Sequence, residues 1–110
     1  DFTEPEQRMI RQVAYSHPTP PADGWSLLPV SIMREPDTVT ATVLVRNASD
    51  QTLTLEALAF ELMNGETPLA DVIHPGLSLP AHSQHAIRLR FACTATDVPA
   101  FGLRYLPPSS

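Results

Sequence analysis

The sequence predicts a mainly β protein, an antiparallel immunoglobulin-like β-sandwich with a short N-terminal helix. Three observations lead to this fold class. Apolar and polar residues alternate in several stretches beyond residue 25, as they do in half-buried strands. These stretches recur about every 10 residues, and turn-forming residues separate them. A helix-capping pattern stands near the beginning of the chain.

The size of the chain fits a single domain. It has 110 residues, and 43% of them are apolar, so a hydrophobic core can form without a metal ion or a disulfide. We expect residues 1–25 to form the helix and a proline-rich linker, residues 26–106 to form the sandwich, and residues 107–110 to form a flexible tail.

The expected helix covers about residues 4–15. Thr3 and Glu6 have the spacing of a capping box, in which each side chain binds the backbone N–H of the other residue. Met9, Ile10 and Val13 then share one helical face, which we expect to dock on the sandwich. The prolines that follow residue 17 end the helix and predict a stiff, extended linker.

Two early strands are predicted, at residues 27–33 and 39–46. In the first, Leu28, Val30 and Ile32 share a face, and Pro29 indicates an edge position because proline cannot donate to a ladder. In the second, the apolar face alternates regularly with a polar one, and only Leu44 breaks the pattern. The residues of that apolar face are Val39, Ala41, Val43 and Val45.

The next stretch, residues 52–63, contains a conflict of phase. Leu53 and Leu55 stand at odd positions, but Leu58, Phe60 and Leu62 stand at even ones. A single strand buries both sets on one face only if a residue is inserted, so we expect a β-bulge near residues 56–57.

A hairpin turn at residues 64–65 leads to further short strands at residues 69–73, 87–91 and 101–105. The segment 74–76 is expected to close the first of these. The predicted core is the set of inward-facing apolar residues of all strands: Val30, Ile32, Val39, Val43, Val45, Leu55, Leu58, Phe60, Leu62, Ile73, Ile87, Leu89 and Phe91.

Charge and composition argue against several classes of function. The formal net charge is −5, so the chain lacks the basic surface that binds nucleic acid or an anionic membrane. No apolar run reaches the roughly 20 residues of a membrane span. We therefore expect a protein partner, with no nucleic acid and no direct membrane insertion.

No constellation of residues predicts catalysis, a cofactor or a metal. His74, His82 and His85 all lie near expected turns and are read as surface histidines. Cys93 continues the inward phase of Leu89 and Phe91, so it is expected to be a small buried hydrophobe. Glycine-rich phosphate loops and nucleophile elbows are absent from the sequence. The sequence thus predicts a protein that is not an enzyme and holds no cofactor.

Three residues are candidates for contact with a partner. Ser31 lies on the expected edge strand, where an unpaired backbone can accept another chain. Arg46 offers a planar guanidinium that suits a partner's carboxylate. Asn47 adjoins Arg46, but for this pair a structural reading is favoured, in which Asn47 shapes the turn and Arg46 pairs with a neighbouring acid.

Several of these segments resemble the SLAP domain, found in Gram-positive bacteria and in the S-layer assembly protein of the accessory Sec system. Residues 39–47 are similar to a family strand that ends in Arg-Asn, and residues 53–62 to the strand after it. Gly65, residues 79–83 and residues 89–91 fall where the family has a turn glycine, a proline-containing turn and a closing strand. Asn64 departs from the acidic residue that often precedes that turn.

The resemblance implies a function exerted by contact rather than by catalysis. It suggests a protein-binding or scaffolding module linked to protein export or to S-layer and cell-envelope assembly. The location would be cytoplasmic or envelope-associated in a bacterium. The alternative is a small-molecule-binding or enzyme-accessory domain with a pocket between the helix and the sandwich.

Overall fold

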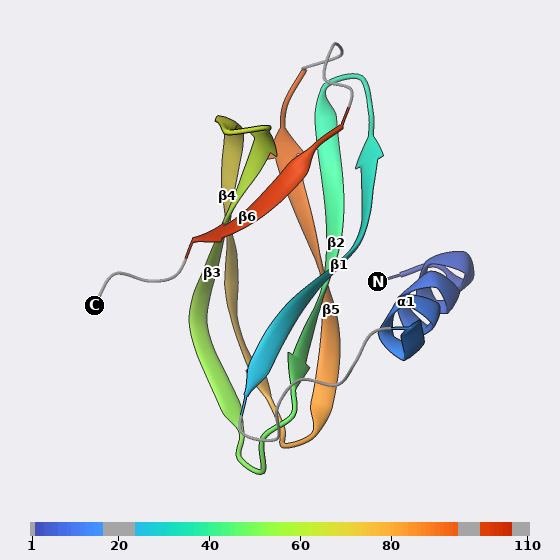
Figure 1. The fold of residues 1–110 in the computed structure, drawn as a ribbon, viewed down its shortest axis with the longest axis vertical. Helices are drawn as coiled ribbons and strands as arrows, with labels where there is room; N and C mark the ends of the chain where they lie inside the picture. Colours follow the sequence, from blue (N-terminus) through green and yellow to red (C-terminus); the bar gives the residue numbers. More distant parts are fainter. Residues whose placement is uncertain (1, 17–23, 95–99, 107–110) are drawn as a thin grey trace.

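The structure is a computed structural model that describes residues 2–16, 24–94 and 100–106. It consists of one helix and six strands: α1 (Glu4–Ser16), β1 (Trp25–Arg34), β2 (Thr38–Asn47), β3 (Leu53–Asn64), β4 (Thr67–Leu79), β5 (Ser83–Ala92) and β6 (Gly102–Leu106). The strands form two antiparallel three-stranded sheets. Sheet A has the order β1-β2-β5 and sheet B the order β4-β3-β6, as Figure 1 shows.

The antiparallel sandwich-like arrangement and the N-terminal helix are thereby confirmed, and the immunoglobulin-like character stays a prediction. The predicted linker at residues 17–21 and the tail at residues 107–110 lie outside the described residues. Within the described ranges, no helix has the length and apolar character needed to cross a membrane.

The core lies between the inner faces of the two sheets. Nine of the predicted core residues are buried in a single apolar cluster: Val39, Val43, Val45, Leu58, Phe60, Leu62, Ile87, Leu89 and Phe91. Cys93 is buried in the same cluster, which confirms that it acts as a small apolar side chain. In the ladder between β2 and β5, Val39 lies opposite Phe91 and Val43 opposite Ile87. Both strands therefore contribute every second side chain to the core.

The helix begins as the sequence predicts. The Glu6 Oε1 atom accepts a hydrogen bond of 2.9 Å from the Thr3 backbone N–H, and the Thr3 hydroxyl accepts one of 3.3 Å from the Glu6 N–H. This reciprocal pair satisfies two N–H groups that the first helical turn would leave without partners. Ile10 and Val13 are half-buried, but Met9 is 48% exposed, so the docking face is narrower than expected.

Strand β1 occupies an edge of sheet A, as Pro29 predicted. However, Leu28, Val30 and Ile32 do not share a face. The register with β2 shifts between Pro29 and Ser31, and Val30 is the inserted residue. Leu28 therefore lies opposite Leu44 on the outer face, whereas Ile32 packs against the core. Val30 itself is only half-buried.

Leu44, which broke the alternation of β2, is 1% exposed although it faces outward. It lies on the central strand of sheet A, between Leu28 of β1 and Ala86 of β5. A central strand is flanked on both sides, so an apolar residue on its outer face is shielded by its neighbours. Helix α1 lies on the same side of the sheet, as the contact of Glu6 with Arg88 shows.

The predicted bulge at residues 56–57 is wrong in its mechanism. The register of β3 with β4 is unchanged from Leu53 to Leu62, and it shifts only between Leu62 and Met63. Instead, the set of side chains that faces the core switches from odd to even positions in β3, and β4 switches at the same place. Glu56 and Ala57 are both exposed there, and so are Pro75 and Gly76 opposite them. A change of face shared by two paired strands needs no inserted residue.

Gly76 makes this joint change of face sterically feasible. A Cβ atom at this position would lie 2.2 Å from the Glu56 carbonyl oxygen and 2.5 Å from that of Leu55. Real Cβ atoms do not approach backbone oxygens so closely, so only glycine fits here.

Strand β4 is longer than predicted, because it continues through residues 74–76 instead of ending there. It tolerates Pro68 and Pro75 because it is an edge strand of sheet B. Ile73, a predicted core residue, is 70% exposed. Its neighbour Val72 lies opposite the inward-facing Phe60, so the pleat turns Ile73 to the outer face. Leu55 and Ile32 are half-buried at the margin of the core.

Replacement of Phe60 by alanine tests this assignment of faces. We expect Phe60→Ala to lower the free energy of unfolding by about 3–5 kcal/mol, because it empties a fully buried site. Ile73→Ala is the matched control on the adjacent face of the sheet, and we expect a change within about 0.5 kcal/mol. Chemical denaturation measures both. A larger loss for Ile73→Ala than for Phe60→Ala would contradict the register.

Candidate partner-binding site

On one side of the sandwich, β1 and β6 form the outer strands of their sheets. On the opposite side, β4 and β5 contact each other across the sheets, which closes that side. Two aromatic contacts connect β1 with the chain around β6. The ring of Trp25 meets that of Tyr105 edge to face at 5.8 Å, and the Arg34 guanidinium lies 4.5 Å from the centre of the Phe101 ring.

Ser31 lies on this outer strand, directly after the bulge at Val30. It is half-buried and faces outward opposite Thr42 of β2. In the described part of the chain, β1 forms a ladder with β2 alone. An edge of this kind presents backbone N–H and C=O groups to another chain, and the bulge and Pro29 interrupt that row.

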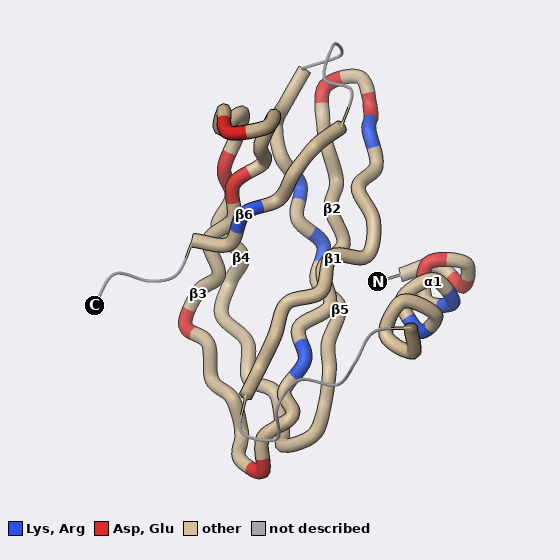
Figure 2. The backbone as a smooth tube through the Cα atoms, viewed as in Figure 1, with Lys and Arg blue, Asp and Glu red and all other residues tan. Residues whose placement is uncertain are grey.

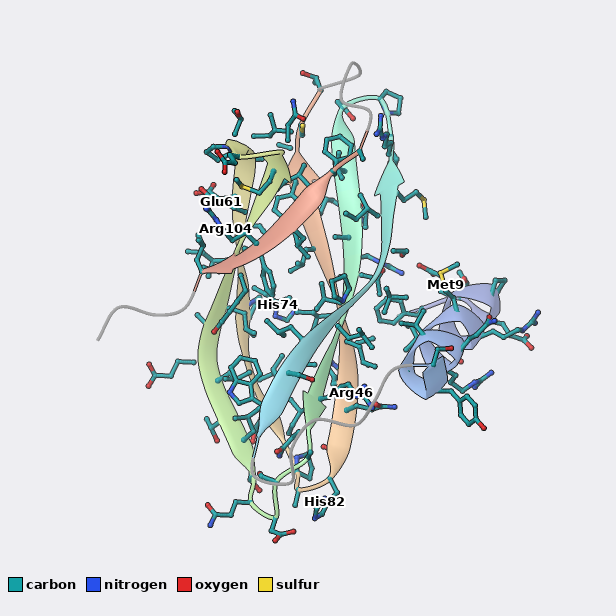
Figure 3. All side chains as sticks on the ribbon, viewed as in Figure 1. Met9, Arg46, Glu61, His74, His82 and Arg104 are labelled. Atoms are coloured by element: carbon teal, nitrogen blue, oxygen red, sulfur yellow. The ribbon has the colours of Figure 1, made fainter. Side chains whose placement is uncertain are left out.

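Arg46 lies on the same outer face as Ser31, four residues further along β2 than Thr42. It is half-buried between Ser26 of β1 and Gln84 of β5. Figure 3 shows its side chain beside the lower part of sheet A. The structure therefore brings Ser31 and Arg46 to one face, separated by about 13 Å along the strand.

Asn47 does not belong to this outer face. It is only 3% exposed, and its side chain connects two turns. Its Nδ2 atom donates hydrogen bonds to the carbonyl oxygens of Gln51, Leu79 and Pro80, at 2.9, 3.2 and 3.0 Å. Its Oδ1 atom accepts from the N–H and the hydroxyl of Ser49, at 3.0 and 2.7 Å. One buried amide thus joins the β2–β3 turn to the β4–β5 turn.

One arginine of β5 connects the start of helix α1 to the outer face of sheet A. The Arg88 guanidinium donates a hydrogen bond of 2.8 Å to the Glu6 Oε2 atom and lies 4.6 Å from the centre of the Phe2 ring. Both charged side chains are about 30% exposed, so water screens the pair only in part. The sequence marked Glu6 as a cap, but its second partner is 82 residues away and left no local signal.

The pKa of Glu6 is lowered from its ordinary value. The hydrogen bond from the Thr3 backbone N–H is the largest cause, followed by the Thr3 hydroxyl; Arg88 adds a smaller contribution, and partial burial opposes the shift. Each of the favourable contacts stabilises the ionised carboxylate. The cap and the docking of the helix therefore depend on the same charge.

The three described histidines lie on different segments, His74 on β4, His82 in the turn after β4 and His85 on β5. His82 has a positive φ of 56° in the turn after β4, and its Nε2 atom lies 2.6 Å from the Asp50 carboxylate. The Nδ1 atom of His74 lies 2.7 Å from the Pro75 carbonyl oxygen, and His85 is exposed on β5. Figure 3 shows His74 in the middle of the sandwich and His82 at its lower end. Among the described residues, no three His, Cys, Asp or Glu side chains converge as metal ligands.

Three of the hollows on the described surface are not lined by α1. The widest, about 580 Å³, is open to solvent between β6 and the β3–β4 hairpin. A smaller one of about 210 Å³ lies at the β4–β5 turn, and one of about 140 Å³ lies near Cys93 and Phe101.

Charge is distributed unequally between the two sheets, a feature that the sequence alone did not reveal. The strands of sheet A carry four arginines and no carboxylate, as Figure 2 shows. The strands of sheet B carry three carboxylates and one arginine. That arginine, Arg104, pairs with Glu61 across the β3–β6 ladder, with its Nε atom 3.1 Å from Oε1.

The family comparison covers most of the chain. The family model of the SLAP domain matches residues 1–89, which include α1 and the strands from β1 into β5. Neither the curated proteins nor the solved structures include a match to the chain.

We expect low pH to destabilise helix α1, because Glu6 must be ionised for its strongest contacts. A lowered pKa means that this contribution to stability is present above the unfolded value of about 4.3. It is then lost as the pH falls through the lower folded value. We expect amide exchange in α1 to accelerate over that acidic range before exchange in β2 does. Glu6→Gln should remove the pH dependence; an unchanged profile would contradict this role.

Asn47→Ala should destabilise the domain by about 1–3 kcal/mol or more, because carbonyl groups at two turns lose a buried donor. Ser83→Ala, which removes a single exposed hydrogen bond to Pro80, is the control and should cost about 0.5–1.5 kcal/mol at most. Thermal or urea unfolding measures both. Equal stability of Asn47→Ala and wild type would show that the amide does not hold the turns together.

Proposed function

The chain belongs to the SLAP domain family, and on this premise we propose that it is a non-enzymatic module that binds a protein partner. The partner would function in protein export or in S-layer and cell-envelope assembly. The name of the family model refers to the accessory Sec system, which supports this setting.

The observation that carries the proposal is the exposed outer position of β1. This strand forms a ladder with β2 only, within the described residues, and lies on the side of the sandwich away from the contact between β4 and β5. Addition of a partner strand to such an edge gains backbone hydrogen bonds, and pockets between alternate side chains supply specificity. Pro29 and the bulge limit uncontrolled pairing along the same edge.

The chemistry of the neighbouring face suits contact better than catalysis. Ser31 lies on it opposite Thr42, and Arg46 lies on it between Ser26 and Gln84. Cys93 is buried in the apolar core, where a thiol is a poor nucleophile. We therefore assign the face to recognition, with Arg46 as the side chain suited to a carboxylate.

Substitution of Ser31 tests the β1 edge. We expect Ser31→Glu to reduce recovery of the partner about fivefold in pull-downs from the native organism, on the scale of one hydrogen bond. The melting temperature should change little, because Ser31 faces away from the core. Ser31→Pro is the harsher variant, since it also removes a backbone donor.

Ser78→Glu is the matched control, because Ser78 is exposed on β4, an outer strand of sheet B. It introduces the same charge without touching β1, so it should leave recovery unchanged. If the Ser31 variants lose stability as much as binding, β1 is an internal strand of the working assembly and the edge proposal is wrong. Turnover of a substrate that disappears on replacement of a histidine would overturn the non-enzymatic assignment.

A further inference from the structure

The start of helix α1 is bound to the row of residues on sheet A that contains Ser31. The ladders place Ser31 of β1, Thr42 of β2 and Arg88 of β5 side by side on the outer face. Arg88 is the residue that binds Glu6 and the Phe2 ring at the start of the helix. The helix also contacts β1, and Figure 1 shows it on this side of sheet A. α1 therefore occupies the face that we assign to recognition.

The burial of β2 shows that this face is covered. Thr40 and Thr42 point away from the core, yet they are only 9% and 6% exposed. The outer face of an antiparallel sheet is commonly solvated unless another element lies on it. The element that the structure describes on this side is α1, whose Glu6 reaches Arg88 beside Thr42. We therefore regard α1 as a cover of the row.

The contacts that attach this cover are weak individually. None of the 13 residues of α1 is buried, and Met9 and Tyr15 are 48% and 93% exposed. The side chains of the Glu6–Arg88 pair are each about 30% exposed, and pairs of this kind contribute little to stability. The buried residues of the core cluster lie between positions 39 and 93, outside the helix. Release of α1 therefore leaves the core between the sheets intact.

The groups that α1 presents to sheet A indicate what would replace it. The strands of sheet A carry four arginines and no carboxylate, so they supply no acid to Arg88 themselves. The helix supplies this acid as Glu6, and the Phe2 ring lies against the same guanidinium. A partner segment with a carboxylate and an aromatic ring offers Arg88 the same two contacts. Such a segment competes directly with the start of α1.

We propose that α1 is a displaceable, autoinhibitory cover of the outer face of sheet A, and that an acidic segment of the partner protein removes it by replacing Glu6 at Arg88. The inference rests on the proposed function, because it adds regulation to the same recognition face. The partner shifts the chain toward the open state to the extent that it binds the uncovered face more tightly. A partner without the acidic segment finds the row of Ser31 covered.

Thiol labelling at position 42 measures the release of α1. The chain with Thr42→Cys and Cys93→Ala carries one thiol, in the middle of the covered row. We expect Glu6→Gln and Arg88→Gln, each made in this chain, to accelerate its reaction with a maleimide about two- to fivefold, the scale of one partly exposed ion pair. Glutamine at position 6 keeps the capping box, so the variant removes the pair with Arg88 and preserves the helix start.

The matched controls change the same chemical groups beside the pair. Glu4→Gln removes a carboxylate of the same helical turn that lies near Arg8, and Arg90→Gln removes a guanidinium two residues further on the same face of β5. Both should leave the labelling rate unchanged. Amide exchange in α1, measured in chains that keep Cys93, gives the same comparison without a change in the core. Equal rates for Glu6→Gln and the unsubstituted chain in both measurements overturn the proposal.

Recovery of the partner in pull-downs from the native organism separates this cover from a merely structural role of Arg88. Glu6→Gln and Arg88→Gln both release α1, but only Arg88→Gln removes the group that the partner's carboxylate binds. We expect Glu6→Gln to raise recovery about two- to fivefold and Arg88→Gln to lower it. Changes in the same direction contradict the exchange of carboxylates at Arg88.

A synthetic peptide of residues 2–16 tests displacement with a known acid. It carries both Phe2 and Glu6, and it is added at millimolar concentration, the range of the effective concentration of a tethered segment. We expect it to accelerate amide exchange in the α1 of the intact chain, because a helix of this length is marginal once it leaves its docking surface. The peptide with Glu6→Gln should be about two- to fivefold less potent. Unaltered exchange in α1, or equal potency of the two peptides, overturns the proposal.

The cover and the proposed function fail in different ways. If Glu6→Gln and wild type recover the partner equally while Ser31→Glu still lowers recovery, the cover is wrong and the β1 edge stands. If no chain recovers a partner, the proposed function fails, and labelling at position 42 together with the peptide still decides whether α1 is displaceable.

Discussion

The apolar contact between the central strands β2 and β3 is the interaction on which the rest of the structure depends. Each is the middle strand of its sheet, so every other strand is positioned by pairing with one of them. Their inward side chains, among them Val43, Val45, Phe60 and Leu62, belong to one buried cluster. Burial of this apolar surface offsets the conformational entropy lost by both sheets. The buried amide of Asn47 then fixes the two turns at the lower end of the sandwich.

The two sheets differ in the charged residues that their strands carry. Sheet A carries arginines and is accompanied by α1, whose Glu6 binds Arg88. Sheet B carries more carboxylates than arginines, and Ile73 lies exposed on its outer face. The helix thus neutralises part of the charge of sheet A, whereas one carboxylate of sheet B, Glu61, is paired within its own sheet. The outer strand β1 belongs to the side away from the contact between β4 and β5.

Local patterns predicted those features whose causes are local. The capping box needs only residues three apart, and the alternation of β2 and β5 follows from the pleat of a strand with one buried face. The edge position of β1 followed from a single proline. The exposure of Ile73 and the course of β4 could not be predicted in this way, because they depend on how β4 pairs with β3.

The sequence by itself determined the fold class, the helix start, most of the core and the edge character of β1, because periodicity and backbone chemistry act within a few residues. Only the tertiary structure decided that β3 and β4 change face together at Gly76 and that Glu6 reaches Arg88. Ser31 and Arg46 could be singled out from local pattern, but their common face and the burial of Asn47 could not. These features arise between segments far apart in the chain, where register and packing, rather than local propensity, set the lowest free energy.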